Sequence, residues 1–178
     1  MGSPRVMRGR SVPELVDAVR GRLSPAALAQ LKALGLSTEG RVPAGYPADS
    51  WAQCVRVIAQ DIFPSLDETE AQRRVGHMRM DQVSRLIKVL MRFSGLTGRE
   101  RALEGFVTRV RDGASFVNTR FTVVGPRRYE AWISDVAGVP GFFWGILEAG
   151  SRMVCGDIDA VRIKAHDGEA YTFEIKRL

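Results

Sequence analysis

The chain has 178 residues, of which 45% are hydrophobic, 26% charged and 8% aromatic, and its net charge is +6. This composition is ordinary for a globular domain and excludes collagen-like, low-complexity and largely disordered chains. No stretch reaches the roughly 18 apolar residues of a membrane-spanning helix. The first residues carry arginines but no apolar segment, which argues against a secretory signal. We therefore expect a cytoplasmic protein.

Apolar residues at helical spacing predict helices through the first half of the chain. Their expected ranges are 13–23, 25–34, 50–63, 67–80, 81–93 and 97–107. N-terminal capping signals stand before several of them, because Ser and Asp side chains accept hydrogen bonds from the first free backbone N–H groups of a helix. These signals are Ser24-Pro25, Ser50 with Gln53, Asp67 with Glu70, and Thr97 with Glu100. The Gly- and Pro-rich stretch 36–49 predicts a loop.

Farther along, the apolar period changes from helical spacing to alternation, which predicts strands. Strands are expected over 117–123, 129–133, 158–165 and 171–175, with a helix over 140–155 between the second and third. Asp167-Gly168 is a strong hairpin signal. We therefore expect an α+β fold in which an N-terminal helical layer packs on a four-stranded antiparallel sheet. Residues 1–12 are expected to be flexible and 13–178 to form one domain, with a helical part over 13–110 and a sheet part over 115–178.

The predicted helix over 140–155 is unusual for its small residues. Gly141, Gly145 and Ala149 recur at every fourth position and form a smooth stripe along one side. Such a stripe lets a helix approach a sheet or another helix closely. Apolar residues occupy most of the remaining surface, so more than one layer must cover this helix.

Positive charge is concentrated between Arg73 and Arg111, where ten residues are basic and three are acidic. One interpretation is a basic face that binds nucleic acid or another anionic surface. The other is the solvated side of two helices, because the segment lacks the interleaved aromatic residues of a stacking platform. The basic face is represented by Arg73, Arg74, Arg79, Arg85 and Arg92.

No pattern for catalysis or metal binding is present. The sequence has no phosphate-binding glycine loop, no HExxH and no G-x-S-x-G. Cys54 and Cys155 form no CxxC pair and no Cys/His cluster, so a zinc site is not expected. We expect no enzyme activity, no metal and no cofactor.

The stretch FTVVGPRRYEAWISDVAGVPGFFWGILEAG, with GYPADSW and FPSLDETEAQRRVG before it, resembles a myxobacterial paralogous family that is catalogued as a domain of unknown function. The strand–strand–helix–strand–strand order is also similar to a wider superfamily. That superfamily contains the heme-nitric-oxide-binding domain, the four-vinyl-reductase domain and the TRAPP subunits. The resemblance implies that a helical layer and the sheet enclose a pocket for an apolar ligand.

The sequence departs from the heme-binding members of this superfamily, and this departure argues against heme. Heme-binding members carry a Tyr-x-Ser-x-Arg motif, and only Ser134 of the corresponding stretch Trp132-Ile133-Ser134-Asp135-Val136 matches it. The iron would need a His on a helix before the sheet. His77 is the candidate there, but its arginine neighbours indicate a solvated face.

Together these observations predict a non-enzymatic regulatory or sensory module in signalling that binds a small apolar ligand or docks a protein partner, which can be a second copy. The alternative is a binder of nucleic acid or an anionic surface through the basic face. An enzyme of the four-vinyl-reductase type is ranked last. Candidate pocket residues, each of which could equally be plain core, are Trp51, Cys54, Phe63, Trp132, Ser134, Phe143 and Trp144.

Overall fold

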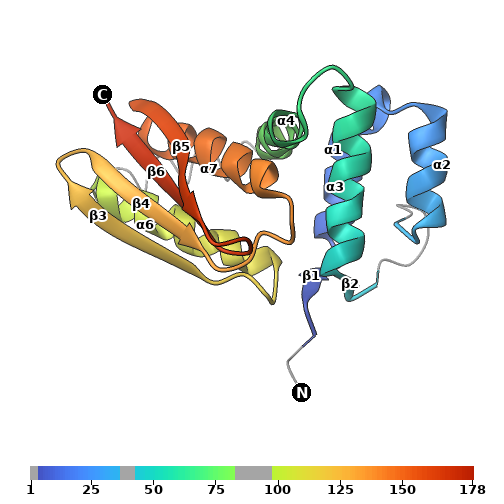
Figure 1. Ribbon diagram of the computed structural model, residues 1–178, viewed down its shortest axis with the longest axis horizontal. Coiled ribbons are helices and arrows are strands. Elements are labelled where there is room, and N and C mark those ends of the chain that lie inside the picture. The colour runs from blue at the N-terminus through green and yellow to red at the C-terminus, as the bar shows by residue number, and fades with distance from the viewer. Residues whose placement is uncertain (1–3, 37–42, 83–97) are drawn as a thin grey trace.

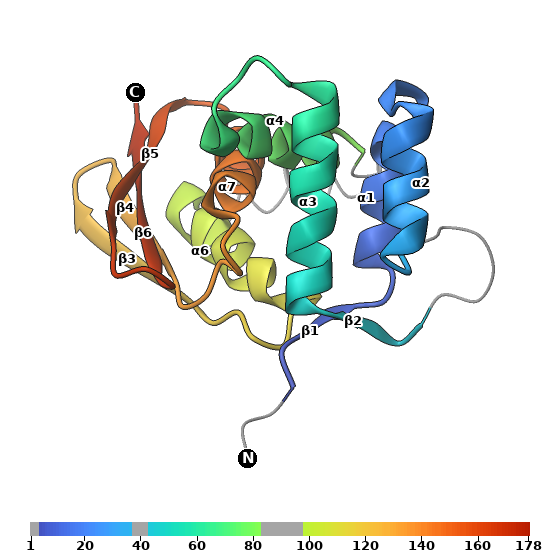
Figure 2. The ribbon, with the colours of Figure 1, turned by 45° about the vertical axis from the view of Figure 1, so that its right-hand side comes forward.

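The computed structural model describes residues 4–36, 43–82 and 98–178. Three helices form one side of the molecule: α1 (Ser11–Val19), α2 (Pro25–Ala33) and α3 (Ala48–Ile62). The other side is a four-stranded sheet with α7 (Pro140–Cys155) and α6 (Arg99–Arg109) against one of its faces, and α4 (Glu68–Asp81) lies between the two sides (Figure 1). Turning the molecule shows α4 above α7 and α6, next to the upright α3 (Figure 2). The α+β fold class is thereby confirmed.

The sheet has the strand order β3-β4-β6-β5, and every neighbouring pair is antiparallel. Its strands are β3 (Thr119–Gly125), β4 (Arg128–Ile133), β5 (Ile158–His166) and β6 (Tyr171–Arg177). Side chains alternate along β4, so that Tyr129, Ala131 and Ile133 are buried toward the helices. Trp132 points to the opposite face, where the guanidinium of Arg120 lies 5.2 Å from its ring.

Two of the expected helix caps form, and one does not. The side chains of Ser24 and Asp67 each accept a hydrogen bond from the backbone N–H three residues later, at 3.1 and 3.0 Å. The Ser50 cap was a wrong prediction, because α3 begins earlier, at Ala48. The N–H of Ala48 instead donates to the carbonyl of Arg5, which satisfies a free end of the helix from a distant segment. Thr97 and most of the predicted helix over 81–93 lie outside the described residues.

Residues 6–8 lie within the segment 1–12 that the sequence predicts to be flexible. These form strand β1 (Val6–Arg8), which pairs antiparallel with β2 (Gly45–Pro47) inside the predicted loop. Met7 of β1 is buried and also forms an isolated β-bridge with Ala114, which precedes the first strand of the four-stranded sheet in the chain. A 3-10 turn over Val110–Gly113 connects α6 to that segment. The first strand therefore joins the helical part to the sheet part.

The small-residue stripe of α7 packs on α4. A Cβ added at Gly145 would lie 2.1 Å from the carbonyl oxygen of Arg73, and one at Gly141 would lie 2.0 Å from that of Thr69. Gly76 of α4 fits equally closely, since a Cβ there would lie 2.3 Å from the carbonyl oxygen of Phe142. The two helix backbones are thus in direct contact, as the stripe predicted.

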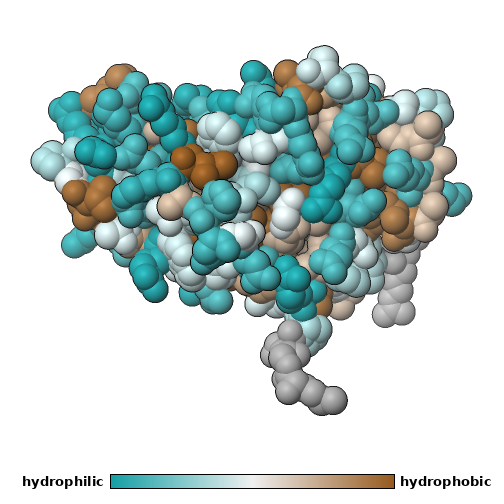
Figure 3. All heavy atoms as spheres, viewed as in Figure 1, coloured by the Kyte–Doolittle hydropathy of each residue, from teal (hydrophilic) through white to brown (hydrophobic). Residues whose placement is uncertain are grey.

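Among the helices that the structure describes, none is long and apolar enough to span a membrane. On the face shown in Figure 3, apolar side chains are scattered among hydrophilic ones.

Candidate functional site

An apolar cavity of about 310 Å³ lies where the two sides of the molecule meet. Segments far apart in the chain form it: β1, the start of α1, α3, the end of α4, the end of α6 with the following turn, and the first turns of α7. We call its lining residues the cavity wall. They are Met7, Ser11, Trp51, Arg79, Met80, Phe106, Arg109, Val110, Gly113, Ala114, Phe142, Phe143 and Ile146.

Four aromatic residues of the described chain, Trp51, Phe106, Phe142 and Phe143, line the cavity. The ring of Trp51 meets Phe142 and Phe143 edge-on, with centroids 5.2 and 5.8 Å apart. Such edge-to-face pairs stabilise a fixed arrangement beyond the area that they bury. Phe106 enters from α6, and its ring occupies the place of a side chain at Gly150, where a Cβ would lie 1.9 Å from the ring. The ring contacts among Trp51, Phe142 and Phe143 therefore join α3 to α7 at the cavity.

The wall has few polar side chains. Among the described residues, those of the wall with polar side chains are Ser11, Arg79 and Arg109. Arg79 forms an ion pair with Glu14 of α1. Arg109 is exposed and has no ion-pair or hydrogen-bond partner within the described residues.

Of the seven predicted pocket residues, the structure brings two to the wall, Trp51 and Phe143. Trp144 follows Phe143 directly on α7, about 100° farther around the helix axis, and is not part of the wall. Its indole N–H instead donates to the carbonyl of Val161 at 2.8 Å. Trp132 lies on the outer face of the sheet.

The remaining three predicted pocket residues also lie away from the wall. Cys54 is fully buried inside the helical part, and this burial raises the pKa of its thiol to about 12. Phe63 lies just past the end of α3, under the guanidinium of Arg22 at 5.7 Å. Ser134 supports a loop, because its hydroxyl accepts a hydrogen bond from the backbone N–H of Asn118 at 2.9 Å.

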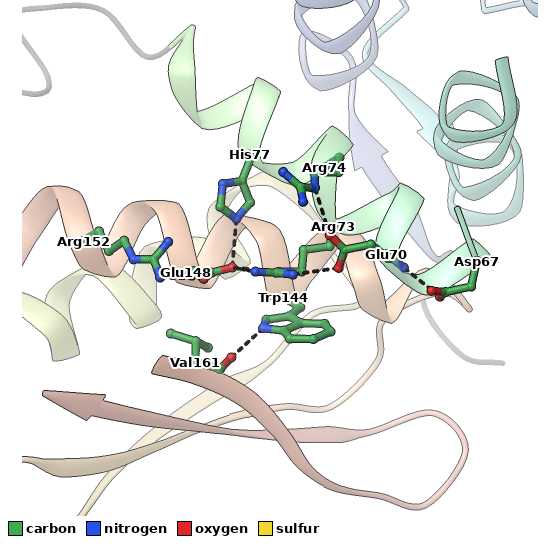
Figure 4. A network of polar contacts seen from close by, with 9 residues as sticks. All are labelled: Asp67, Glu70, Arg73, Arg74, His77, Trp144, Glu148, Arg152 and Val161. Atoms are coloured by element: carbon green, nitrogen blue, oxygen red, sulfur yellow. Dashed lines mark hydrogen bonds and ion pairs between the residues drawn. The ribbon is translucent and has the colours of Figure 1, made fainter. Parts of the chain in front are cut away.

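A second cluster of polar groups lies between α4 and α7 (Figure 4). Its centre is Glu148, whose side chain is 4% exposed. One carboxylate oxygen, Oε2, accepts hydrogen bonds from Arg73 Nε at 2.7 Å and lies 2.9 Å from His77 Nε2. The other oxygen is 2.8 Å from Arg152 Nη2.

The same cluster holds Trp144 in place. The guanidinium of Arg73 stacks over the indole ring at 4.5 Å and also pairs with Glu70. Burial alone would raise the pKa of Glu148. The hydrogen bonds from His77 and Arg73 and the charges of Arg73 and Arg152 outweigh it, so the pKa is lowered. Glu148 is therefore a buried anion whose role is to connect α4 to α7.

These contacts correct two interpretations of the sequence. His77 does not belong to a solvated face, because it is only 30% exposed and contacts Glu148. The basic face is less unbalanced than the sequence indicated, since Arg73, Arg74 and Arg79 are each paired with a glutamate. Its other two named members, Arg85 and Arg92, lie outside the described residues.

The cavity wall does not fit an iron-bound heme. Proteins hold heme iron with His, Cys or Tyr, or with Met opposite His. Of these types, the described wall contains only Met7 and Met80. The chain has two histidines: His77 is held by Glu148, and His166 stacks on Tyr171 at the last hairpin. Within the described residues, no group of three or more His, Cys, Asp or Glu side chains is placed to hold a metal ion.

Comparison with known proteins identifies both sequence and structural relatives. A family model described as "Protein of unknown function (DUF2378)" matches residues 6–176. The search of curated proteins finds no match. A mutant of the T. Tengcongensis H-NOX protein is similar in structure, with a TM-score of 0.66, 16% identity, and coverage of 96% of this chain and 97% of that chain. A mutant H-NOX protein from K. algicida, solved in the Fe(II) unliganded state, has a TM-score of 0.68 and 11% identity, with 97% of each chain covered. At these identities the likeness establishes an H-NOX-like fold.

Proposed function

The chain belongs to the DUF2378 family of proteins of unknown function, and we propose that it is a non-enzymatic sensory module that holds a small apolar ligand, without heme, in the cavity. The cavity is the observation that carries this proposal. Its volume is at the lower end of the roughly 300–1,000 Å³ of ligand pockets. Its wall is mostly apolar and aromatic, with a few polar side chains, which is typical of small-molecule sites.

The place of the cavity supports a sensory role. A ligand there contacts β1, α1 and α3 on one side and α6 and α7 on the other. A bound molecule stabilises the arrangement of these elements that it fits best, and so shifts their populations. The similarity to H-NOX proteins supports the same proposal at the level of the fold.

The first test is to compare the mass of the full-length protein under native and denaturing conditions after purification from its native host. We expect a non-covalent adduct that is lost on denaturation. Ile146→Trp adds a large ring to the cavity wall and should remove most of the adduct, because the space is then filled. A protein without adduct that also binds no member of a panel of small apolar compounds would contradict the proposal.

The matched control is Ile62→Trp. Ile62 is also partly buried but lies at the end of α3, away from the wall. This variant should keep the adduct. Far-UV circular dichroism and thermal melting of both variants would show that each one folds, so that loss of the adduct reports on the cavity.

The absence of a fitting iron ligand gives a second expected result. Hemin titrated into the protein should produce no Soret change that saturates at one equivalent. His77→Ala should leave the titration unchanged, since His77 lies outside the wall. A sharp Soret band that stays with the protein through gel filtration would show that heme does bind.

A further inference from the structure

We infer that the ligand of the cavity is an apolar molecule with one terminal anionic group, and that Arg109 binds this group. The inference rests on the proposed function and specifies the chemical class of the ligand. The shared chemistry is an apolar chain or ring that ends in a carboxylate or a phosphate. Both of these groups match the planar, multiply donating guanidinium of arginine.

The first support is the sign of the charges in the wall. Among the described residues, the charged side chains that line the cavity are the two arginines, and no Asp or Glu lines it. The Ser11 hydroxyl adds a further hydrogen-bonding group. A cationic ligand would meet like charge, whereas an anionic one would meet complementary charge.

The second support is the difference between the two arginines. Arg79 already pairs with Glu14, so its charge is compensated within the protein. Arg109 has no partner in the described part of the chain and is exposed. It can therefore accept an anion without first giving up an ion pair. Exposure also means that its guanidinium remains hydrated while the cavity holds no ligand, so the unpaired charge carries little cost.

The third support is the position of Arg109 along α6. Phe106 lies three residues before it on the same face of the helix, and Val110 follows it, and all three line the cavity. The methylene groups of an arginine can extend an apolar wall while its charged head stays at the edge. An apolar chain that lies along Phe106 would thus bring its terminal group to the guanidinium of Arg109.

The experiment compares three ten-carbon probes, decanoate, decyl phosphate and decanol, by isothermal titration calorimetry below their micelle concentrations. The cavity is small for a ligand site, so chains of medium length are the suitable probes. We expect the wild-type protein to bind the two anions about tenfold more tightly than the alcohol, as hydrogen bonds to a charged group are strong. Arg109→Gln should abolish this difference, so that the two anions bind no more tightly than decanol does.

Two further variants separate charge from structure. Arg109→Lys keeps the charge but not the planar donor pair, and should retain part of the preference. Arg101→Gln removes an exposed arginine from the same helix outside the wall, and should behave like the wild type. A preference for decanoate alone or decyl phosphate alone identifies which anion the site fits.

The failures are distinguishable. If all three probes bind equally well, the cavity is a ligand site, but the inference of an anionic ligand is overturned. If the anions remain preferred in Arg109→Gln, the assignment of Arg109 is overturned. If none of the probes binds and Ile146→Trp does not reduce the amount of bound adduct, the proposed function itself fails.

Discussion

Replacing Gly145 by alanine is expected to lower the free energy of unfolding by about 3 kcal/mol, because the methyl group has no space between α4 and α7. A Cβ at this position would lie 2.1 Å from the carbonyl oxygen of Arg73 and 3.1 Å from the Cα of Gly76. Both of these atoms belong to the α4 backbone. No side chain can rotate away, so the two helices must separate along their whole contact.

Urea denaturation at neutral pH measures this loss directly. For a domain of this size, a loss of that order lowers the melting temperature by about 6–12 °C. Gly105→Ala is the control, because Gly105 lies on α6 and nothing is within 4 Å of an added Cβ. Alanine is the better helix former, so this variant should be up to about 1 kcal/mol more stable than the wild type. A Gly145→Ala variant as stable as the wild type would show that the helices are not in backbone contact.

Glu148→Gln should destabilise the protein by about 3 kcal/mol at neutral pH, since it removes the anion that compensates a partly buried cluster of cations. Glutamine keeps the shape of the side chain, but it cannot balance the charges of Arg73 and Arg152. Glu174→Gln is the matched control on the outer face of the sheet. There the partner, Arg128, is 57% exposed, so the loss should be much smaller than at Glu148, because solvent screens an exposed pair.

The effect of Glu148 depends on pH with a defined sign. Its pKa is lowered in the folded protein, so the unfolded chain binds its proton more readily. The advantage of the wild type over Glu148→Gln should be complete above about pH 5, because the ordinary glutamate pKa is about 4.3. It should then decrease as the pH falls through the lowered pKa of the folded state. A difference between the two proteins that stays constant down to pH 3 would contradict this role.

The elements that the sequence predicted well are those whose signals are local. Such signals depend only on residues that are close together in the sequence. Examples are the alternation along β4, the Asp167-Gly168 turn and the caps at Ser24 and Asp67. The start of α3 depended on a distant partner. Its first N–H bonds to Arg5, which no local pattern around Ser50 reveals. Strand β1 was missed for the same reason, since three residues form a strand only when a partner segment reaches them.

The cavity was harder to predict than the fold. The sequence shows that α7 is apolar on nearly every side, but not which side meets a cavity and which meets the sheet. Phe143 and Trp144 were therefore predicted together, and the structure separates them. The sequence analysis placed His77 on a solvated face because its neighbours in the chain are arginines. Its hydrogen-bond partner, Glu148, is 71 residues away in the sequence. The role of Met7 depends on β1 and could not be predicted without it.

The position of β1 has a consequence for how the chain acquires its shape during synthesis. One edge of the strand pairs with β2, which ends at Pro47, but the other edge bonds to Ser115, whose N–H donates to the carbonyl of Val6 at 2.9 Å. A ribosome that adds about 5–20 residues per second needs roughly 3 to 14 seconds to reach the second partner after the first. During that time an open strand edge is available to other chains. The wall of the cavity extends to Ile146, so the wall is complete later still, and a ligand can bind there only after most of the chain has emerged.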